Sequence, residues 1–157
     1  MRIREEKSMV KKEERRVIAR NKRASHDYFI LEEFEVGIVL TGTEIKSIRA
    51  SKASINEAYV QAKKGLLTIE NMHISTYKEG NIFNHQEVRT RVLLAHKKEI
   101  LKLENKVKLE SMTIIPLELY ITKGLAKLKI ALCKGKKNYD KRESIKQKDI
   151  ERNLRKY

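Results

Sequence analysis

The sequence predicts a mainly β protein, built as a small closed antiparallel barrel with short helices and a basic, disordered C-terminal tail. Six or seven short segments rich in β-branched and aromatic residues follow one another, with turn residues between them. The length of 157 residues suits a single domain. An open sheet with helices on one face is the alternative. The closed barrel, of which the OB type is a small example, is favoured because closure leaves no exposed strand edges.

The first strand is predicted over residues 26–40, where HDYFILEEFEVGIVL is rich in aromatic and β-branched residues and alternates apolar with polar side chains. It is expected to bend near residues 32–33. Thr41 and Glu44 then have the spacing of a capping box, followed by apolar residues on one helical face. A short helix is therefore predicted near residues 42–50.

Turn residues divide the rest of the chain. Gly65 can supply the positive φ of a tight hairpin turn between two apolar runs. Pro116 has no N–H to donate to a sheet, so it is expected at a strand edge or a bulge. The predicted segments are strands over 58–62, 66–72, 89–94, 112–121 and 125–133, a surface loop over 77–85 and an amphipathic helix over 95–103.

The positive charge is concentrated at the two ends of the chain. Thirty-six Lys and Arg against 21 Asp and Glu give a formal net charge of +15. Residues 1–24 carry 10 basic and 4 acidic side chains, residues 134–157 carry 10 and 4, and the span between them carries 16 and 13. This balance indicates a polyanionic partner, either a nucleic acid or an anionic membrane surface. The middle can fold without much self-repulsion, while the ends are expected to gain order on phosphate.

Three parts are therefore expected. They are a flexible basic N-terminal extension (1–16), an OB-like barrel (17–137) that would bind the polyanion, and a basic C-terminal tail (138–157). Apolar residues in the tail are too few to bury a face against the barrel, so the tail is expected to become helical on binding.

Composition excludes several classes of protein. No run approaches the roughly 18 consecutive apolar residues of a membrane-spanning helix, and the first residues lack the apolar run of a secretory signal. A cytoplasmic protein with no membrane partner is the resulting expectation. The single Cys133 excludes an internal disulfide and a CxxC site, and it is expected as a small buried side chain.

No catalytic or metal-binding pattern is found, so the chain is predicted not to be an enzyme and to need no cofactor. The four histidines lack HxH or HExxH spacing, and Walker A, GxGxxG and GxSxG sequences are absent. His26 and Asp27 are adjacent, and neighbours on a strand point to opposite faces, which argues against a dyad. Glu32, Glu33 and Glu35 are interpreted as a solvated strand edge, although Glu35 could accept a hydrogen bond from a base amino group.

Basic residues near the first strand and helix are candidates for RNA contacts. Asn21, Lys22 and Arg23 directly precede the first predicted strand, where an anchored arm could hold phosphate contacts in register. Lys46 and Arg49 are three residues apart on the predicted helix, so both could reach one ligand from the same side.

A second basic group lies toward the C-terminus. Lys127 and Lys129 alternate with apolar residues, so both are expected on one face of a strand, where they could follow a phosphate backbone. In the segment Lys134-Gly135-Lys136-Lys137 the glycine lets an RNA backbone approach while the lysines neutralise its charge. Tyr139 follows and could stack on an unpaired base. An RNA-binding surface is predicted here.

Several long segments resemble the small protein B family, which binds transfer-messenger (SsrA) RNA in bacterial ribosome rescue. They are NKRASHDYFILEEFEVGIVLTGTEIKSIRA, GNIFNH, RTRVLLAHKKEI, PLELY and KGKKNYDKR, in this order. The resemblance implies an OB-like barrel with short helices and no enzymatic activity. It also implies binding to the tRNA-like domain of transfer-messenger RNA in place of the missing anticodon arm, and delivery of that RNA to stalled ribosomes in trans-translation. Elongation factor Tu would be an indirect partner through the charged RNA, and the protein is expected as a monomer in solution.

The resemblance also implies roles for particular residues. The implied RNA-binding residues are Asn21, Lys22, Glu35, Leu94, Lys127, Lys134, Gly135 and Lys136. The implied start of a tail that enters the decoding centre and the empty mRNA channel as a helix comprises Tyr139, Asp140, Lys141 and Arg142, with Lys137 just before them. An empty channel is lined with rRNA phosphate, so a basic tail can gain order there.

The sequence departs from the family pattern at a few positions. Ser25 stands where the family commonly has a basic residue, and residues 86–88 replace a proline-containing turn. The tail is also somewhat short, and both Met1 and Met9 are compatible with a translation start.

Overall fold

The computed structural model describes the backbone of residues 15–155, and the side chains of all of these except 81–83, 138–140, 144 and 155. In this range the strands are β1 (Arg16–Arg20), β2 (Tyr28–Ile38), β3 (Ala53–Ser54), β4 (Tyr59–Lys63), β5 (Leu66–Glu70), β6 (His73–Ile74), β7 (Arg91–Leu94), β8 (Thr113–Thr122) and β9 (Leu125–Gly135). The helices there are α2 (Ala24–Asp27), α3 (Gly42–Arg49), α4 (Lys97–Glu110), α5 (Asn138–Arg155) and the 3-10 helix η1 (Lys78–Phe83). The predicted mainly β class is confirmed.

The strand pairings run in a ring. All pairs are antiparallel, and the main sheet has the order β1-β8-β4-β5-β7-β2-β9, with β9 also paired to β8. In the described part of the chain, the shortest pairings of the ring are between β4 and β8, where Val60 lies opposite Ile114, and between β2 and β7, at residues 37–38 of β2. β9 pairs along its length with both β2 and β8, so it has long pairings on both of its edges.

Two tight turns, and the bulges of β2 and β8, shape the sheet. The turns between β4 and β5 and between β8 and β9 have positive φ at both central residues, 52° and 74° at Lys64 and Gly65 and 50° and 73° at Lys123 and Gly124. Such turns match the twist of the strands that they join. The register shifts between Ile30 and Glu32 on β2, and after Pro116 on β8. These shifts agree with the bend and the bulge expected from the sequence.

Alternate residues of the strands fill the interior. On β9, Leu128 and Ile130 are fully buried, while Lys127 and Lys129 are only partly buried and lie on the opposite face. Cys133 is buried in a second, smaller apolar cluster under α2, as expected. Burial, with a smaller contribution from the charge of Glu33, raises the pKa of the Cys133 thiol to about 11.

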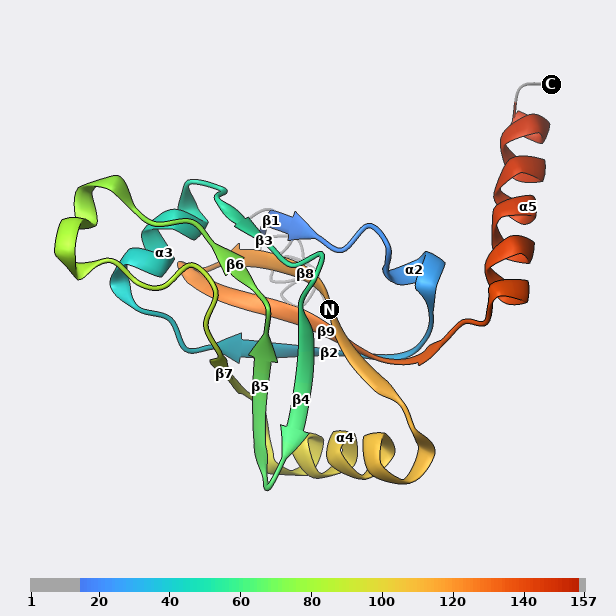
Figure 1. Ribbon diagram of the computed structural model, residues 1–157, viewed down its shortest axis with the longest axis horizontal. Helices are drawn as coiled ribbons and strands as arrows, with labels where there is room; N and C mark the ends of the chain where they lie inside the picture. The colour runs from blue at the N-terminus through green and yellow to red at the C-terminus, as the bar shows by residue number, and fades with distance from the viewer. Residues whose placement is uncertain (1–14, 156–157) are drawn as a thin grey trace, which may run out of the picture.

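Helices cover the sheet at its ends. Figure 1 shows α3 at one end of the long axis, α2 and α5 at the other, and α4 beside the end of the β4–β5 hairpin. α4 packs on β4 and β8 and buries Ile100 and Leu103, which lie three residues apart on the same face of the helix. It continues beyond residue 103, where the prediction ended, because Val107 adds another apolar contact on this face. Ser111, in the left-handed region, ends it.

The N-terminal part of the sheet differs from the prediction. β1 precedes residues 21–23 and pairs with residues 118–121 of β8, so these residues lie between a strand and α2 and not at the end of a free arm. His26 and Asp27 lie in the short helix α2, not on a strand. β1 was missed because its central residues, Val17, Ile18 and Ala19, are all half-buried and show no alternation. Residues 1–14, the greater part of the predicted N-terminal extension, lie outside the described residues.

The C-terminal segment is a helix in the structure, whereas disorder was expected. α5 stands away from the β-rich body beyond α2 (Figure 1). Its apolar residues Ile145, Ile150 and Leu154 are exposed. A contact to the body is made at its start, where Lys141 pairs with Asp27 at 3.4 Å. The helix therefore depends mainly on local interactions, such as the Glu143–Lys146 ion pair. Among the described residues, no helix has the length and apolar composition needed to cross a membrane.

A buried ion pair joins α3 to the main sheet. Thr41 and Glu44 form the predicted capping box at the start of α3. Both oxygens of Glu44 also accept hydrogen bonds from arginines. Arg89 donates to Oε1 and to Oε2, and Arg91 donates to Oε2. The side chains of Glu44 and Arg91 are each 0% exposed. The same carboxylate therefore caps the helix and neutralises a buried guanidinium.

The Arg91 guanidinium also holds the surrounding backbone. It donates to the carbonyl oxygen of Met72 at 2.7 Å, and to those of Gln86 and Glu87 at 3.4 and 3.3 Å. Burial by itself would raise the pKa of Glu44, but hydrogen bonds from Arg89, the Thr41 backbone and Arg91 lower it to about 2. In the folded protein the carboxylate therefore stays charged at pH values well below its ordinary pKa of 4.5.

Replacing Glu44 by Gln should lower the free energy of unfolding by roughly 3 to 5 kcal/mol, because the buried Arg91 charge loses its partner. Urea unfolding at pH 7 measures this change. Glu110→Gln is the matched control, since Glu110 pairs with Lys106 on the surface at 3.0 Å, and it should change stability by less than about 1 kcal/mol. Equal losses in the two variants would contradict the importance of the buried pair.

Acid should weaken the fold through the same carboxylate. Because the pKa of Glu44 is lower in the folded chain, its stabilising contribution is complete above about pH 4.5 and is lost as the pH falls toward 2. The change corresponds to roughly 3 kcal/mol. Urea unfolding between pH 5 and pH 2.5 should show a decline that is steeper in the wild type than in Glu44→Gln. Parallel declines would assign the acid sensitivity to other carboxylates.

Candidate nucleic-acid interface

The predicted residues of β9 lie on the outer face of the ring, between residues of the two neighbouring strands. In the register of the sheet, Lys127 is opposite Gly37 on β2 and Tyr120 on β8. Lys129, two residues further on, is opposite Glu35 and Glu118. Because side chains alternate along strands, these groups share the outer face.

A shallow hollow lies beside this face. It has a volume of about 380 Å³ and is called the Glu35 hollow below. Its lining residues are Glu35, Gly37, Leu94, Ala95, His96, Glu99 and Lys127. Three residues predicted to bind RNA, Glu35, Leu94 and Lys127, thus meet here from three different strands. Leu94 is 58% exposed, and it packs closely beside Gly37, where a Cβ would lie 3.4 Å from its own Cβ.

The charge of Lys129 is largely balanced within the protein. Its Nζ lies 3.6 Å from a carboxylate oxygen of Glu33 and 3.7 Å from one of Glu118. Glu118 also pairs with Arg15 at 2.9 Å and with Arg20 at 3.5 Å. Lys129 therefore belongs to an ion-pair network on the outer face, while Lys127 lines the hollow.

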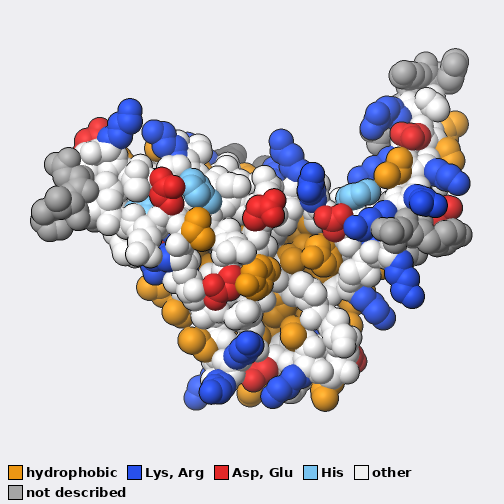
Figure 2. Space-filling model, viewed as in Figure 1, with side chains coloured by type: hydrophobic (Ala, Val, Ile, Leu, Met, Phe, Trp, Pro, Cys, Tyr) orange, Lys and Arg blue, Asp and Glu red, His pale blue; other side chains and the backbone are white. Residues whose placement is uncertain are grey.

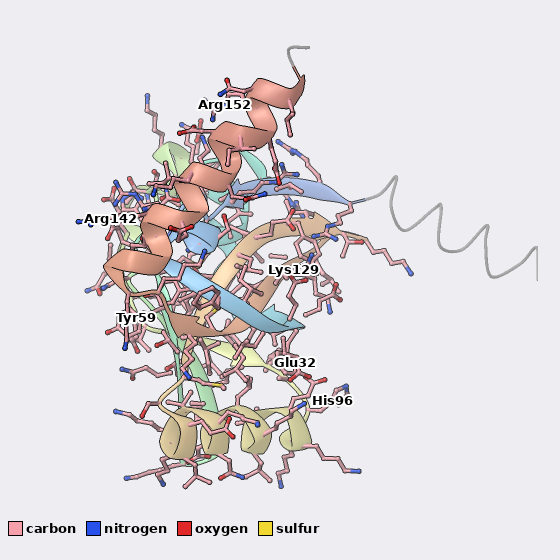
Figure 3. The ribbon with its side chains drawn as sticks, turned by 90° about the vertical axis from the view of Figure 1, so that its right-hand side faces the viewer. Glu32, Tyr59, His96, Lys129, Arg142 and Arg152 are labelled. Carbon is pink, nitrogen blue, oxygen red and sulfur yellow. The ribbon has the colours of Figure 1, made fainter. Side chains whose placement is uncertain are left out.

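A second hollow lies between α2 and the segment that leads into β4. It has a volume of about 220 Å³ and is called the Tyr59 hollow. Its lining residues are Asn21, Arg23, Ala24, Asp27, Tyr28, Asn56, Glu57, Ala58, Tyr59 and Ile115. Figure 3, which labels Tyr59 and His96, shows residues of the two hollows on opposite sides of the body. The structure therefore does not gather all the predicted RNA-binding residues into one site.

Asn21 has a structural task in the turn that leads to α2. Its Nδ2 donates to the Pro116 carbonyl at 3.1 Å, its backbone N–H donates to the Leu117 carbonyl at 2.9 Å, and its Oδ1 accepts from the Arg23 backbone at 3.3 Å. These bonds tie the turn to the bulge of β8. Lys22 and Arg23 are exposed on the fixed turn.

The end of β9 is held against α2. Lys136 donates from Nζ to the Ser25 carbonyl at 2.9 Å and lies 4.9 Å from the centre of the Phe29 ring. Its backbone N–H donates to the Asp27 carbonyl at 2.9 Å. Lys134 is exposed, and a Cβ added to Gly135 would meet nothing within 4 Å. The backbone at Gly135 is therefore open to an approaching ligand.

The predicted tail residues lie at the start of α5. Lys137 and Arg142 are exposed, and Lys141 is held by Asp27. The side chains of Tyr139 and Asp140 lie outside the described residues. Figure 2 shows Lys and Arg side chains projecting from α5 in several directions, and Figure 3 labels Arg142 and Arg152 on it.

The basic residues of α3 are separate from the other candidates. Lys46 lies 5.4 Å from the centre of the Tyr77 ring, and Arg49 is exposed. α3 lies at the opposite end of the long axis from α2 and α5 (Figure 1). These two residues would therefore contact a different part of a ligand from that reached by the end of β9.

A family model described as SmpB protein matches residues 18–157. The chain belongs to the SmpB family. An SsrA-binding protein of Enterococcus hirae is 51% identical over 139 residues, which cover 88% of this chain and 90% of the relative. An SsrA-binding protein of Anoxybacillus flavithermus is 50% identical over 143 residues, covering 91% and 93%. The family resemblance predicted from the sequence is thereby confirmed.

A solved structure is similar to the SmpB-family chain as well. It is described as "tmRNA-SmpB: a journey to the center of the bacterial ribosome". The match has a TM-score of 0.64 and 39% sequence identity, and it covers 80% of this chain and 92% of that chain. The mainly β fold is therefore shared with a structure of this family.

Sequence reasoning missed part of the outer face of this SmpB-family chain. Tyr120 donates a hydrogen bond from its hydroxyl to Glu35, and Arg15 lies 4.0 Å from the centre of the Tyr120 ring. The alternation of Glu118 and Tyr120 with buried Leu119 could have indicated that both lie on the outer face. Their partners could not be predicted, because Tyr120 and Glu35 are 85 residues apart in the chain.

Proposed function

We propose that this chain binds the tRNA-like domain of transfer-messenger RNA and delivers it to stalled ribosomes for trans-translation. The observation that carries the proposal is the Glu35 hollow, which brings Glu35, Leu94 and Lys127 together in a chain of the SmpB family. Its relatives are named as SsrA-binding proteins, and its solved counterpart is described with transfer-messenger RNA and the bacterial ribosome.

The three residues have complementary chemistry toward folded RNA. Lys127 neutralises a phosphate, and the exposed Leu94 contacts a base or sugar face. The carboxylate of Glu35 accepts a hydrogen bond from a base amino group or a 2′-hydroxyl. A site that combines a phosphate contact with a base or sugar contact favours a shaped RNA over a featureless polyanion.

The parts of the chain have different tasks in this proposal. Residues 17–137 form a closed OB-like barrel that holds the RNA, a reading supported by the ring of strand pairings. Residues 138–157 are the tail. The remaining RNA contacts are assigned to Asn21, Lys22, Arg23, Lys46, Arg49, Lys129, Lys134, Gly135 and Lys136.

The tail reads the state of the ribosome. Its proposed contacts with the decoding centre and the empty mRNA channel begin with Lys137, Tyr139, Asp140, Lys141 and Arg142. α5 buries little against the body, so rRNA phosphate can surround its basic side chains and stabilise the helix. A channel that is filled with mRNA would exclude the helix, which makes the tail sensitive to stalling.

The proposed role also defines the state, location and indirect partner of the protein. The protein acts as a monomer in the cytoplasm, stands in for the missing anticodon arm of the RNA, and meets elongation factor Tu only through the charged RNA. It carries out no catalytic step of its own and needs no cofactor.

Removal of residues 139–157 should separate RNA binding from rescue. The shortened chain should bind the tRNA-like domain within about threefold of the full chain, because the barrel is intact, and should lose peptide tagging on stalled ribosomes. Gel shifts and an in vitro tagging assay measure the two activities. Competition with tRNA and plain duplex RNA is the specificity control. Equal affinity for the tRNA-like domain, tRNA and duplex RNA would favour a general rRNA-binding barrel.

Lys127 and Lys129 should contribute unequally although they share a face. Lys127→Ala should weaken RNA binding and lower the slope of log K against log salt by about 0.7 to 0.9, as expected for one lost phosphate contact. Lys129→Ala should change that slope less, because Glu33 and Glu118 already balance its charge. Titrations between 50 and 300 mM KCl would make this comparison. A larger slope change in Lys129→Ala would contradict the assignment.

A further inference from the structure

We propose that Tyr120 is a positioning residue for RNA recognition, whose hydroxyl fixes the carboxylate of Glu35 so that its second oxygen can accept a hydrogen bond from the RNA. This inference rests on the proposed function, because it requires the Glu35 hollow to be an RNA contact. Tyr120 itself does not line the hollow. Its effect on binding would pass through Glu35.

The two side chains meet across the central strand. Glu35 on β2 and Tyr120 on β8 both flank β9, one opposite Lys129 and the other opposite Lys127. The Tyr120 hydroxyl donates to Oε2 of Glu35. Among the described residues, the Glu35 side chain has no other hydrogen bond or ion pair, so Oε1 is left as an acceptor, and Glu35 lines the hollow.

Tyr120 is held rigidly enough to act as a support. Although it belongs to the outer face, it is only 1% exposed. The Arg15 guanidinium covers its ring at 4.0 Å, and Glu118 fixes that guanidinium at 2.9 Å. Burial, and then the hydrogen bond to Glu35, raise the pKa of Tyr120 above its ordinary value, so the hydroxyl keeps its proton at neutral pH.

Glu35 needs such a support because, in the part of the chain that the structure describes, the bond from Tyr120 is its single side-chain hydrogen bond. It is an exposed side chain with several rotatable bonds, and ordering it on binding costs conformational entropy. The lysine opposite it, Lys129, is occupied with Glu33 and Glu118 and leaves the orientation of Glu35 to Tyr120. A carboxylate that is ordered before the RNA arrives raises the affinity by reducing this cost.

A double-mutant cycle tests the inference. The wild type, Tyr120→Phe, Glu35→Gln and the double variant are titrated with the labelled tRNA-like domain of transfer-messenger RNA. Tyr120→Phe keeps the ring under Arg15 and removes the hydroxyl alone. We expect it to weaken binding about tenfold, Glu35→Gln to weaken binding at least as much, and the double variant to match Glu35→Gln.

A control variant and two further measurements separate positioning from a structural effect. Thr90→Val is the matched control, because Thr90 also donates a hydroxyl to a carboxylate, Glu70 at 2.7 Å, outside the hollow. It should leave RNA affinity unchanged. Tyr120→Phe should also keep the thermal midpoint within about 3 °C and leave the salt slope of binding unchanged, since it removes no phosphate contact.

The outcomes distinguish the inference from the proposed function. If Glu35→Gln weakens binding and Tyr120→Phe does not, the positioning role is wrong while the RNA site stands. Additive losses in the double variant would also overturn it, because Tyr120 would then act independently of Glu35. If neither Glu35→Gln nor Lys127→Ala alters binding, the hollow is not the RNA site, and both the proposed function of the hollow and the role of Tyr120 fail.

Discussion

The buried pair of Glu44 and Arg91 is the interaction on which the arrangement of this protein depends. A guanidinium with no exposed surface can lie in the interior only with a charged partner and with acceptors for its other N–H groups. Glu44 supplies the charge from α3, and Met72 supplies a carbonyl from the segment between β5 and β6. Three segments are thereby fixed around the start of β7. The other end of this short strand carries Leu94, so the same pair helps to define the wall of the Glu35 hollow.

From this anchor the core determines which residues face outward. β9 is paired on both sides, and Leu128 and Ile130 must face the interior. A shift of the register by one residue would bury lysines and expose the core. The positions of Lys127 and Lys129 on the outer face are thus consequences of apolar packing. The outward face of β9 is therefore fixed by the requirement that its apolar side chains pack in the core.

The limits of prediction from the sequence follow from the same physics. Periodicity and turn chemistry are local, so the β8–β9 hairpin, the capping box of α3 and the common face of Lys127 and Lys129 could be predicted. The joining of Glu35, Leu94 and Lys127 in one hollow depends on pairings between distant strands and had to come from the family resemblance. Neither source indicated the Tyr120 hydrogen bond or the Arg91 pair. Both join residues that are far apart in the chain, and neither leaves a periodic signal.

The distribution of charge assigns attraction and recognition to different parts of the chain. The two ends carry most of the net charge of +15, whereas residues 25–133 hold 16 basic and 13 acidic side chains. On the outer face, Lys129 is already balanced by Glu33 and Glu118. A surface that is nearly neutral gains little from phosphate in general, so its contribution must come from groups in defined positions. If the chain binds RNA as proposed, the ends would attract nucleic acid in general, while the middle would discriminate among RNAs by shape. The carboxylates on the outer face would then reduce attraction to phosphate that lacks the right shape.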